Sequence, residues 1–191
     1  MIDVVAIACV NNAFSIGLNN DLLYAFKEDI EYFKQTTMNH VVIMGRGTYD
    51  SLPEHVRPLP NRVNIVITRD PSKYTGAKNL LFFNNLADAI VKAKEIAKEK
   101  QQDKVFVIGG GEIYKESMPY LSRLLLTVVK DSTKGDTFFP KIVSNDWCVT
   151  KMQKPIESRN LKELYGENLG GAFHPLYEIE FIEMKRTVYR F

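Results

Sequence analysis

Apolar and polar positions along this chain follow two different periods. Short, nearly continuous apolar runs, typical of strands buried on both faces, occur at residues 2–10, 41–44, 64–68, 80–83, 104–108 and 124–129. Apolar residues that recur every third or fourth position predict helices at residues 27–38, 46–52, 86–100 and 112–121. Strands that alternate with helices indicate an α/β fold, with a parallel sheet covered by helices on both faces.

The helix expected at residues 27–38 has two different sides. Ile30, Phe33 and Thr37 share one face, which we expect to pack on the sheet. Charged residues such as Glu31 lie on the opposite face and should be in water.

The end of the chain follows another pattern. Residues 147–152 and 177–183 alternate between apolar and polar, which predicts an antiparallel hairpin at one edge of the sheet. The polar stretch between them, residues 153–175, is expected to be a long loop. No Pro/Gly/Ser-rich linker divides the chain, so residues 1–191 are expected to form a single domain.

Composition narrows the class of protein. The 25 basic and 23 acidic residues leave a net charge of +2, which argues against a dedicated nucleic-acid binder. Hydrophobic residues make up 45% of the chain, enough for a sizeable core. No run reaches the roughly 18 apolar residues of a membrane helix, and no signal peptide is recognisable at the start. We therefore expect neither a nucleic-acid nor a membrane partner.

The cysteines and histidines do not predict a metal site. Cys9 and Cys148 lie far apart, and the three histidines share no ligand spacing. Two lone thiols suit a reducing compartment, so a cytoplasmic location is expected, and the simplest interpretation is that both are small core residues.

Three consecutive glycines are the most informative local feature. Gly109, Gly110 and Gly111 follow an apolar strand and come directly before a helix. Glycine allows the backbone to approach a ligand closely, and a helix N-terminus offers N–H groups to an anion such as a phosphate. A tight turn without a ligand is the structural alternative. The run is not the Rossmann fingerprint, because Tyr114 stands where the third glycine of that fingerprint is required.

A second glycine cluster repeats this design. Gly45, Arg46 and Gly47 follow the strand at 41–44, while Thr68 and Arg69 end the next strand. Two arginines at neighbouring strand ends are a plausible pocket for the extra phosphate of NADPH, since guanidinium forms paired, charge-assisted bonds to phosphate. For either arginine alone, the alternative is a surface residue paired with a nearby acid.

Taken in order, these pieces resemble the dihydrofolate reductase family over nearly the whole chain. The stretches that carry the resemblance are residues 16–17, 29–34, 43–46, 57–62, 107–111 with Tyr114, and 135–140. The resemblance implies a mostly parallel eight-stranded sheet flanked by helices. It also implies hydride transfer from NADPH to 7,8-dihydrofolate, giving the 5,6,7,8-tetrahydrofolate used in one-carbon metabolism and nucleotide precursor synthesis.

By the same resemblance, Asp29 is the acid that assists protonation of pterin N5. Thr127 matches the hydroxyl partner of that acid, and Tyr24 stands in the first loop where the family normally has tryptophan. We expect an apolar cleft to raise the pKa of Asp29, and acid–base assistance of this kind is typically worth roughly 10²–10⁴-fold. The alternative is a first-turn acid that merely favours the helix dipole.

The remaining site residues also follow from the resemblance. Arg62 should grip the glutamate α-carboxylate of dihydrofolate, and Phe33 should pack on its aminobenzoyl ring. The expected substrate-binding residues are Val5, Ala6, Ile30, Phe33, Leu52, Leu59, Arg62 and Ile108. The expected cofactor-binding residues are Ile7, Ile16, Asn20, Met44, Gly45, Arg46, Gly47, Thr48, Thr68, Arg69, Gly110, Gly111, Glu112, Ile113 and Tyr114.

The chain departs from the family pattern at a few positions. Tyr24 and Leu23 replace tryptophan and proline in the lid loop, Gly47 replaces a residue that is often basic, and Glu112 brings a negative charge to the expected pyrophosphate. Tyr24 could keep the tryptophan's hydrogen bond to a structural water, since a phenol is also a donor. Two other functions stay open: a related reductase of another pterin or of a riboflavin precursor, and a weakly catalytic protein that binds folate and NADPH. We expect a monomer.

Overall fold

The computed structural model describes residues 1–164 and 175–187. The strands are β1 (Asp3–Asn11), β2 (Ser15–Leu18), β3 (Asp21–Leu22), β4 (Val41–Gly45), β5 (Val63–Ile67), β6 (Leu80–Phe83), β7 (Lys104–Val107), β8 (Arg123–Val129), β9 (Thr137–Phe138), β10 (Trp147–Met152), β11 (Ile156–Arg159) and β12 (Leu176–Arg186). The helices are α1 (Lys27–Thr37), α2 (Arg46–Ser51), α3 (Leu86–Glu99), α4 (Gly111–Ser117) and α5 (Leu161–Leu164). Short 3₁₀ turns occupy Glu54–Val56, Pro71–Lys73, Met118–Tyr120 and Ser144–Asp146.

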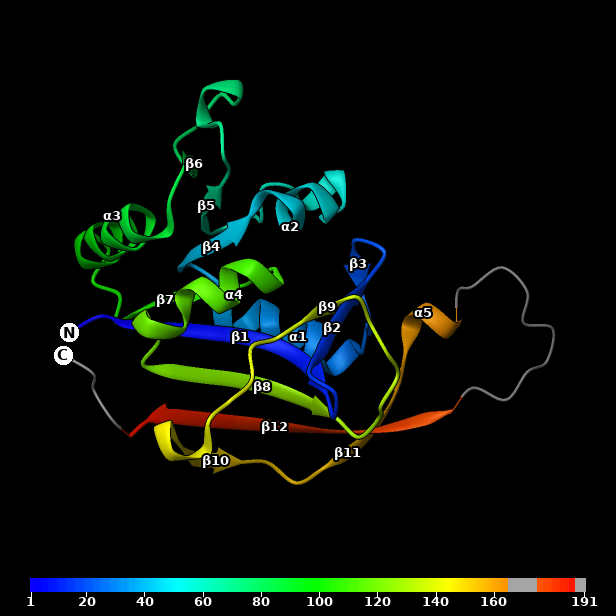
Figure 1. Ribbon diagram of the computed structural model, residues 1–191. Coiled ribbons are helices and arrows are strands. Elements are labelled where there is room, and N and C mark those ends of the chain that lie inside the picture. Colours follow the sequence, from blue (N-terminus) through cyan, green and yellow to red (C-terminus); the bar gives the residue numbers. More distant parts are fainter. Residues whose placement is uncertain (165–174, 188–191) are drawn as a thin grey trace.

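One large twisted sheet organises the molecule (Figure 1). Its strands follow the order β10-β12-β8-β1-β7-β4-β5-β6, with β11 paired to β12 beside this path. The pairs from β8 to β6 are parallel, whereas β12 runs antiparallel to both β8 and β10. The predicted α/β fold, a mostly parallel sheet with antiparallel strands at one edge, is confirmed.

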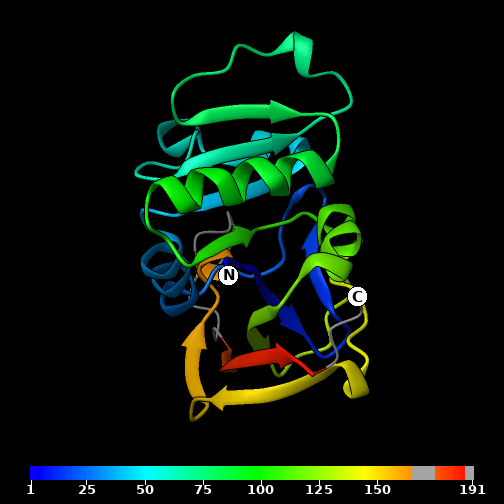
Figure 2. The same cartoon turned by 90° about the vertical axis from the view of Figure 1, so that its left-hand side faces the viewer.

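Helices cover both faces of this sheet, as the strand sequences require. The long helix α3 lies along one face (Figure 2), where it packs with α4 on side chains such as Val4, Ile43 and Ile65. On the other face, α1 and α2 cover Val5 and Val42, among others. Neighbouring residues of one strand thus lie in different core clusters, and this explains why the strands are apolar at nearly every position.

A smaller sheet, β3-β2-β9, stands beside the carboxyl end of β1. It is formed by the loop of residues 12–23, which we call the lid loop, and by part of the segment that follows β8. The lid loop is therefore a paired structure, held by main-chain hydrogen bonds to a segment more than 100 residues away.

The expectation of a loop over residues 153–175 is wrong for part of its length. Residues 165–174 lie outside the described residues, but β11 and α5 fall within the stretch. The sequence of β11, Ile-Glu-Ser-Arg, has no apolar alternation, because the strand is mostly exposed and is held by pairing with β12. A tertiary contact fixes it here: Ser158 is buried and donates a hydrogen bond to Glu28 of α1.

The predicted inner face of α1 is also wrong at one position. Thr37 is buried and Phe33 packs on the core, but the side chain of Ile30 is 46% exposed. Asp29 and Tyr32, which are both partly buried, lie on the inner side of the helix instead, and Ile30 lies at the rim.

Two negative findings concern the described residues. No helix among them is both long and apolar enough to cross a membrane. Within residues 1–164 and 175–187, no three His, Cys, Asp or Glu side chains are grouped so that they could hold a metal ion.

Candidate active site

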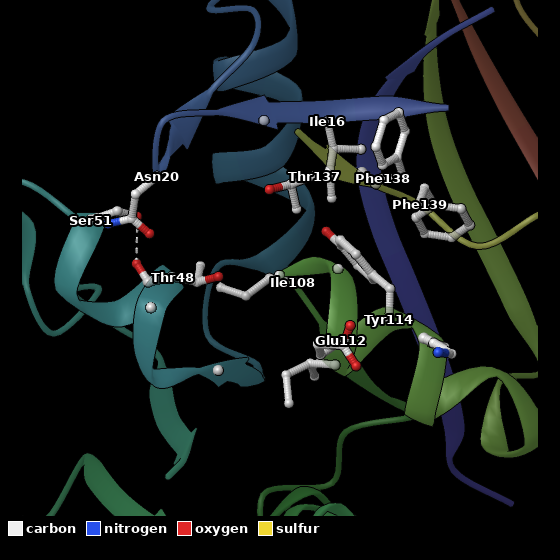
Figure 3. Close-up of a pocket in the computed structure, with 18 of the residues that line it drawn as sticks. Ile16, Asn20, Thr48, Ser51, Ile108, Glu112, Tyr114, Thr137, Phe138 and Phe139 are labelled. Atoms are coloured by element: carbon white, nitrogen blue, oxygen red, sulfur yellow. Dashed lines mark hydrogen bonds between the residues drawn. The ribbon is translucent and has the colours of Figure 1, made fainter. Parts of the chain in front are cut away.

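A cavity of about 790 Å³ opens at the carboxyl ends of the parallel strands. Its walls come from the lid loop, the starts of α2 and α4, the end of β5, and residues 136–140. Figure 3 shows Asn20 and Thr48 on one side, Glu112 and Tyr114 on the other, and Ile108 between them. Ligands of parallel α/β sheets bind at this end of the strands, and the volume is within the range of small-molecule sites.

Glycines let two strand-to-helix turns meet at the floor of this cavity. The N–H of Gly45 donates to the carbonyl of Gly109 at 2.7 Å. A Cβ on Gly45 would lie 3.0 Å from Ile113 Cγ1, and one on Gly110 would lie 3.3 Å from Thr48 Oγ1. Gly109 has a φ of +105°, and a Cβ there would lie 2.9 Å from the Tyr114 ring. Side chains would therefore push the two turns apart, a contact between the two glycine clusters that the sequence alone did not predict.

Nearly all of the expected cofactor residues line this cavity. They are Ile16, Asn20, Gly45, Arg46, Gly47, Thr48, Thr68, Arg69, Gly110, Gly111, Glu112, Ile113 and Tyr114. Ile108, expected at the substrate, lines it too. Two expected residues do not. Met44 is fully buried in the core below α1. Ile7 is also buried, and its carbonyl accepts a 2.7 Å hydrogen bond from the hydroxyl of Tyr114, which does line the cavity.

The two arginines of the cavity differ in their protein contacts. Arg46 forms an ion pair with Asp50 one helical turn away, at 2.8 Å, which is the alternative that the sequence left open. Both side chains are largely exposed, so this pair is weak and can exchange for a ligand. Arg69 is exposed beside the buried Thr68 at the end of β5.

Asp29 lies in the first turn of α1, where this helix contacts β8. The hydroxyl of Thr127, which is buried on β8, donates to Asp29 Oδ1 at 2.5 Å. Burial raises the pKa of the Asp29 carboxyl, and the Thr127 hydrogen bond opposes this only in part. Asp29 itself is not part of the cavity wall, but Cys9 and Tyr114 are. Burial, and after it the Asp29 charge, raises the pKa of both the Cys9 thiol and the Tyr114 phenol. Cys9 pairs in register with Thr127, the hydrogen-bond partner of Asp29, and this links the carboxyl to the cavity wall.

Arg62 is a second buried charge near α1. Its side chain donates to Thr37 Oγ1 at 2.9 Å, to the Pro60 carbonyl at 2.9 Å and to the Lys34 carbonyl at 3.4 Å. Its guanidinium carbon lies 5.8 Å from the centre of the Phe33 ring. Burial lowers the pKa of Arg62, although the group stays charged. Three of its five N–H groups are thus occupied by the protein, and two remain for a ligand.

The apolar residues expected at the substrate are brought together, with two exceptions. Val5 and Leu59 are buried in the core cluster beneath α1, and Phe33, Leu52 and Ile108 pack against it. The Ala6 side chain faces the opposite side of the sheet, because side chains alternate along β1. Ile30 is the other exception, being exposed.

The structure does not support a water-mediated role for Tyr24. Its ring is buried between Phe26 and Tyr177, and its hydroxyl donates to Asp131 and accepts from Asn11 Nδ2 at 3.0 Å. A phenol has a single proton to donate. Since the Tyr24 hydroxyl donates this proton to the Asp131 carboxylate in a hydrogen bond, it has none left for the expected bond to a structural water.

Several residues of the site were missed by sequence reasoning. Cys9 and Ser51 line the cavity, and the Asp136 carboxylate accepts a 2.8 Å hydrogen bond from the main-chain N–H of Asn19 in the lid loop. Asn19 and Asn20 both have positive φ angles. The adjacent asparagines were a usable signal, because asparagine tolerates the left-handed conformation better than other residues with a Cβ.

Comparison with known proteins agrees with this geometry. The family model described as dihydrofolate reductase matches residues 3–165. A dihydrofolate reductase of Bacillus subtilis is 36% identical over 140 residues, which cover 73% of this chain and 76% of the relative. One from Aedes albopictus is 34% identical over 146 residues, covering 72% of this chain and 77% of the relative.

A solved structure extends the comparison to the whole fold. The dihydrofolate reductase of Enterococcus faecalis, complexed with NADP(H) and RAB-propyl, superposes with a TM-score of 0.74. The match covers 97% of each chain at 25% sequence identity.

Proposed function

The chain belongs to the dihydrofolate reductase family, and from that premise we propose which of its side chains carry out the reaction. The reaction is the NADPH-dependent reduction of 7,8-dihydrofolate to 5,6,7,8-tetrahydrofolate. The observation that carries our assignment is the Asp29–Thr127 pair, a carboxyl held by a buried hydroxyl whose partner in the β1–β8 register, Cys9, lines the cavity.

The cavity fits the cofactor. Its floor consists of glycine backbone, with Gly45 and Gly110 at the starts of α2 and α4, neither of which has a side-chain cap. Uncapped N–H groups and two nearby guanidiniums suit a pyrophosphate and a further phosphate. We assign the pyrophosphate to the Gly45 and Gly110 turns and the adenosine 2′-phosphate to Thr68 and Arg69. Bound there, NADPH supplies the hydride that the nicotinamide delivers to the pterin.

Asp29 binds and orients the pterin and controls the proton that N5 receives. A carboxylate in this position accepts hydrogen bonds from the pterin's amino group and ring N–H. Burial raises its pKa, which keeps the proton available closer to neutral pH than an exposed aspartate would. Thr127 holds the carboxyl in one orientation through Oδ1 and leaves Oδ2 for the substrate.

Arg62 and Phe33 are the proposed contacts for the rest of dihydrofolate. The two free N–H groups of Arg62 form paired bonds to the α-carboxylate, and the bonds to Thr37 and Pro60 fix the plane of the guanidinium beforehand. Phe33 offers its ring face beside that guanidinium to the aminobenzoyl group. A reductase of another pterin or of a riboflavin precursor would have no use for this pair.

A direct assay tests the assignment. Purified protein is mixed with NADPH and dihydrofolate, and NADPH oxidation is followed by absorbance. We expect turnover with wild type and a decrease at neutral pH in Asp29→Asn. Turnover of another pterin but not of dihydrofolate would favour the related reductase, and NADPH binding without turnover would favour a binding protein.

We further propose that the chain acts as a monomer in the cytoplasm. The cavity and the Asp29–Thr127 pair are both built from one copy of the chain. Both cysteines are free thiols, which suits a reducing compartment. Light scattering of the purified protein tests the monomer, since a mass near twice 21.9 kDa would contradict it.

A further inference from the structure

The two ends of the lid loop meet in one buried hydrogen-bond network. Asn11 is the last residue of β1, before the loop, and Tyr24 is the first residue after it. Their side chains are buried, with 2% and 5% exposure, and are joined directly by the Asn11 Nδ2 to Tyr24 hydroxyl bond of 3.0 Å. This hydrogen bond between two side chains therefore closes the 12 residues of the lid loop into a ring.

Asp131 completes the network from a third segment. It lies two residues after β8, and its carboxylate accepts from the Tyr24 hydroxyl and from the Thr133 N–H at 3.0 Å. Burial alone would raise the pKa of Asp131, but the hydrogen bonds from Tyr24 and Thr133 lower this pKa overall. The carboxylate is therefore charged, and it accepts a charge-assisted hydrogen bond from the Tyr24 hydroxyl. Asn11 Nδ2 also donates to the Thr133 carbonyl at 2.7 Å, which ties the same turn to the other end of the loop.

Asn11 also shapes the start of the loop. Its Oδ1 accepts from the main-chain N–H groups of Ala13 and Ser15, each at 3.0 Å. All of its donor and acceptor directions are thus used within the network. An isosteric leucine could not replace any of these bonds.

The ring controls residues that face the cofactor. Between Asn11 and Tyr24, the loop supplies Ile16, Gly17, Asn20, Asp21 and Leu22 to the cavity wall. Beyond Asp131, the same segment continues to β9, whose residues Thr137 and Phe138 pair with β2 of the loop and line the cavity beside it. The network therefore lies at the base of the two paired segments that form this side of the cavity, and none of its own residues lines the cavity.

We propose that Asp131 and Asn11, acting through Tyr24, are positioning residues that keep the lid loop closed over the nicotinamide end of the cavity. The inference rests on the proposed cofactor site. The hydrogen bonds of Tyr24 with Asp131 and Asn11 fix both ends of the lid loop, and they take no part in proton delivery. Bound NADPH should therefore dissociate slowly.

The experiment compares two single variants with the double variant. Tyr24→Phe removes only the hydroxyl, whereas Asp131→Ala removes the acceptor of that hydroxyl and of the Thr133 N–H. The rate of NADPH dissociation is measured by stopped-flow displacement, and kcat and KM for dihydrofolate are measured separately. We expect dissociation to accelerate about tenfold in each single variant, the effect of losing one charge-assisted hydrogen bond. We expect the double variant to be no faster than either single one.

A matched control comes from the same aromatic cluster. The Tyr177 hydroxyl donates to the Glu163 carboxylate at 2.6 Å, and its ring contacts that of Tyr24, but it makes no bond to either end of the lid loop. Tyr177→Phe therefore loses the same kind of bond and should leave the dissociation rate unchanged. Asp131→Asn keeps a neutral acceptor of the same shape and should recover part of the slow dissociation.

The outcomes separate this inference from the proposed function. Unchanged dissociation in Tyr24→Phe together with a lower melting temperature would show that the network is merely structural. Effects that multiply in the double variant would show that the two residues act independently. Wild-type protein that fails to bind NADPH would overturn the cofactor site itself.

Discussion

The two halves of the site hold their charges in opposite ways. At the substrate end, Arg62 is buried and Asp29 is mostly buried, and they are already bonded to Thr37 and Thr127. At the cofactor end, Arg46 and Arg69 are exposed, and the buried parts are glycine backbone. A group that must have a shifted pKa or a fixed direction needs burial. A group that only attracts phosphate works from the surface, where it costs little stability.

Replacing the buried carboxyl should have the largest effect on activity. Asp29→Asn keeps the shape and still accepts from Thr127, but it cannot carry or tune the proton. We expect kcat at neutral pH to decrease by about 10²–10⁴-fold, with partial recovery in acid, where the substrate is already protonated. Rates measured from pH 5 to pH 8 check this, with Glu31→Gln on the exposed face of the same helix as the control. Equal loss at every pH would contradict the assignment.

The same variant should become more stable while it loses activity. The folded-state pKa of Asp29 is raised, so ionisation opposes folding. Its contribution to stability is fully present below the unfolded-state pKa and is lost as the pH rises through the folded-state pKa. Asp29→Asn removes this loss, and its free energy of unfolding should exceed that of wild type at pH 7 but not at pH 3. Urea unfolding at the two pH values measures the difference.

Removing the buried guanidinium should harm both folding and substrate binding. Arg62→Ala leaves Thr37 Oγ1 and two carbonyls without their donor, which should lower the free energy of unfolding by about 2–4 kcal/mol. Loss of the carboxylate contact should also raise KM for dihydrofolate. Titration with dihydrofolate and with a pterin that lacks the glutamate isolates the second effect, because only the first ligand should bind more weakly.

The exposed arginine should show the contrasting behaviour. Arg69→Ala should weaken NADPH binding by about 10- to 150-fold, the value of one charge-assisted contact, and leave NADH binding unchanged. Its free energy of unfolding should stay within about 0.5 kcal/mol of wild type, as is usual at surface positions. Calorimetric titration with both nucleotides measures this. Equal losses for NADH and NADPH would place the 2′-phosphate elsewhere.

The sequence predicted the exposed half of the site better than the buried half. Glycine clusters after apolar strands indicate a turn and an anion site locally, and most of the residues named from them line the cavity. The core strands and helices also follow from periodicity, because each is decided by neighbouring residues.

The buried half depends on contacts between segments far apart in the chain. No residue close to Tyr24 in the sequence indicates that its hydroxyl donates a hydrogen bond to Asp131, which lies 107 residues away along the chain. The polar strand β11 forms because β12 pairs with it. The exposure of Ile30 depends on which side of α1 faces the sheet. These features arise from tertiary packing, which local periodicity does not encode.

Glu112 offers the finest test of the contrast between the two halves. Its carboxylate lines the cavity at the start of α4, where the charge opposes a bound pyrophosphate, yet the side chain is exposed. Water and salt therefore screen the repulsion, and Glu112→Gln should tighten NADPH binding only about two- to fivefold, as expected for one exposed charge interaction. Glu116→Gln on the same helix lies outside the cavity wall and should have no effect. The gain should disappear at high salt; a gain that persists there would mean that the carboxylate becomes buried against the cofactor, and that this half of the site also works through desolvated charge.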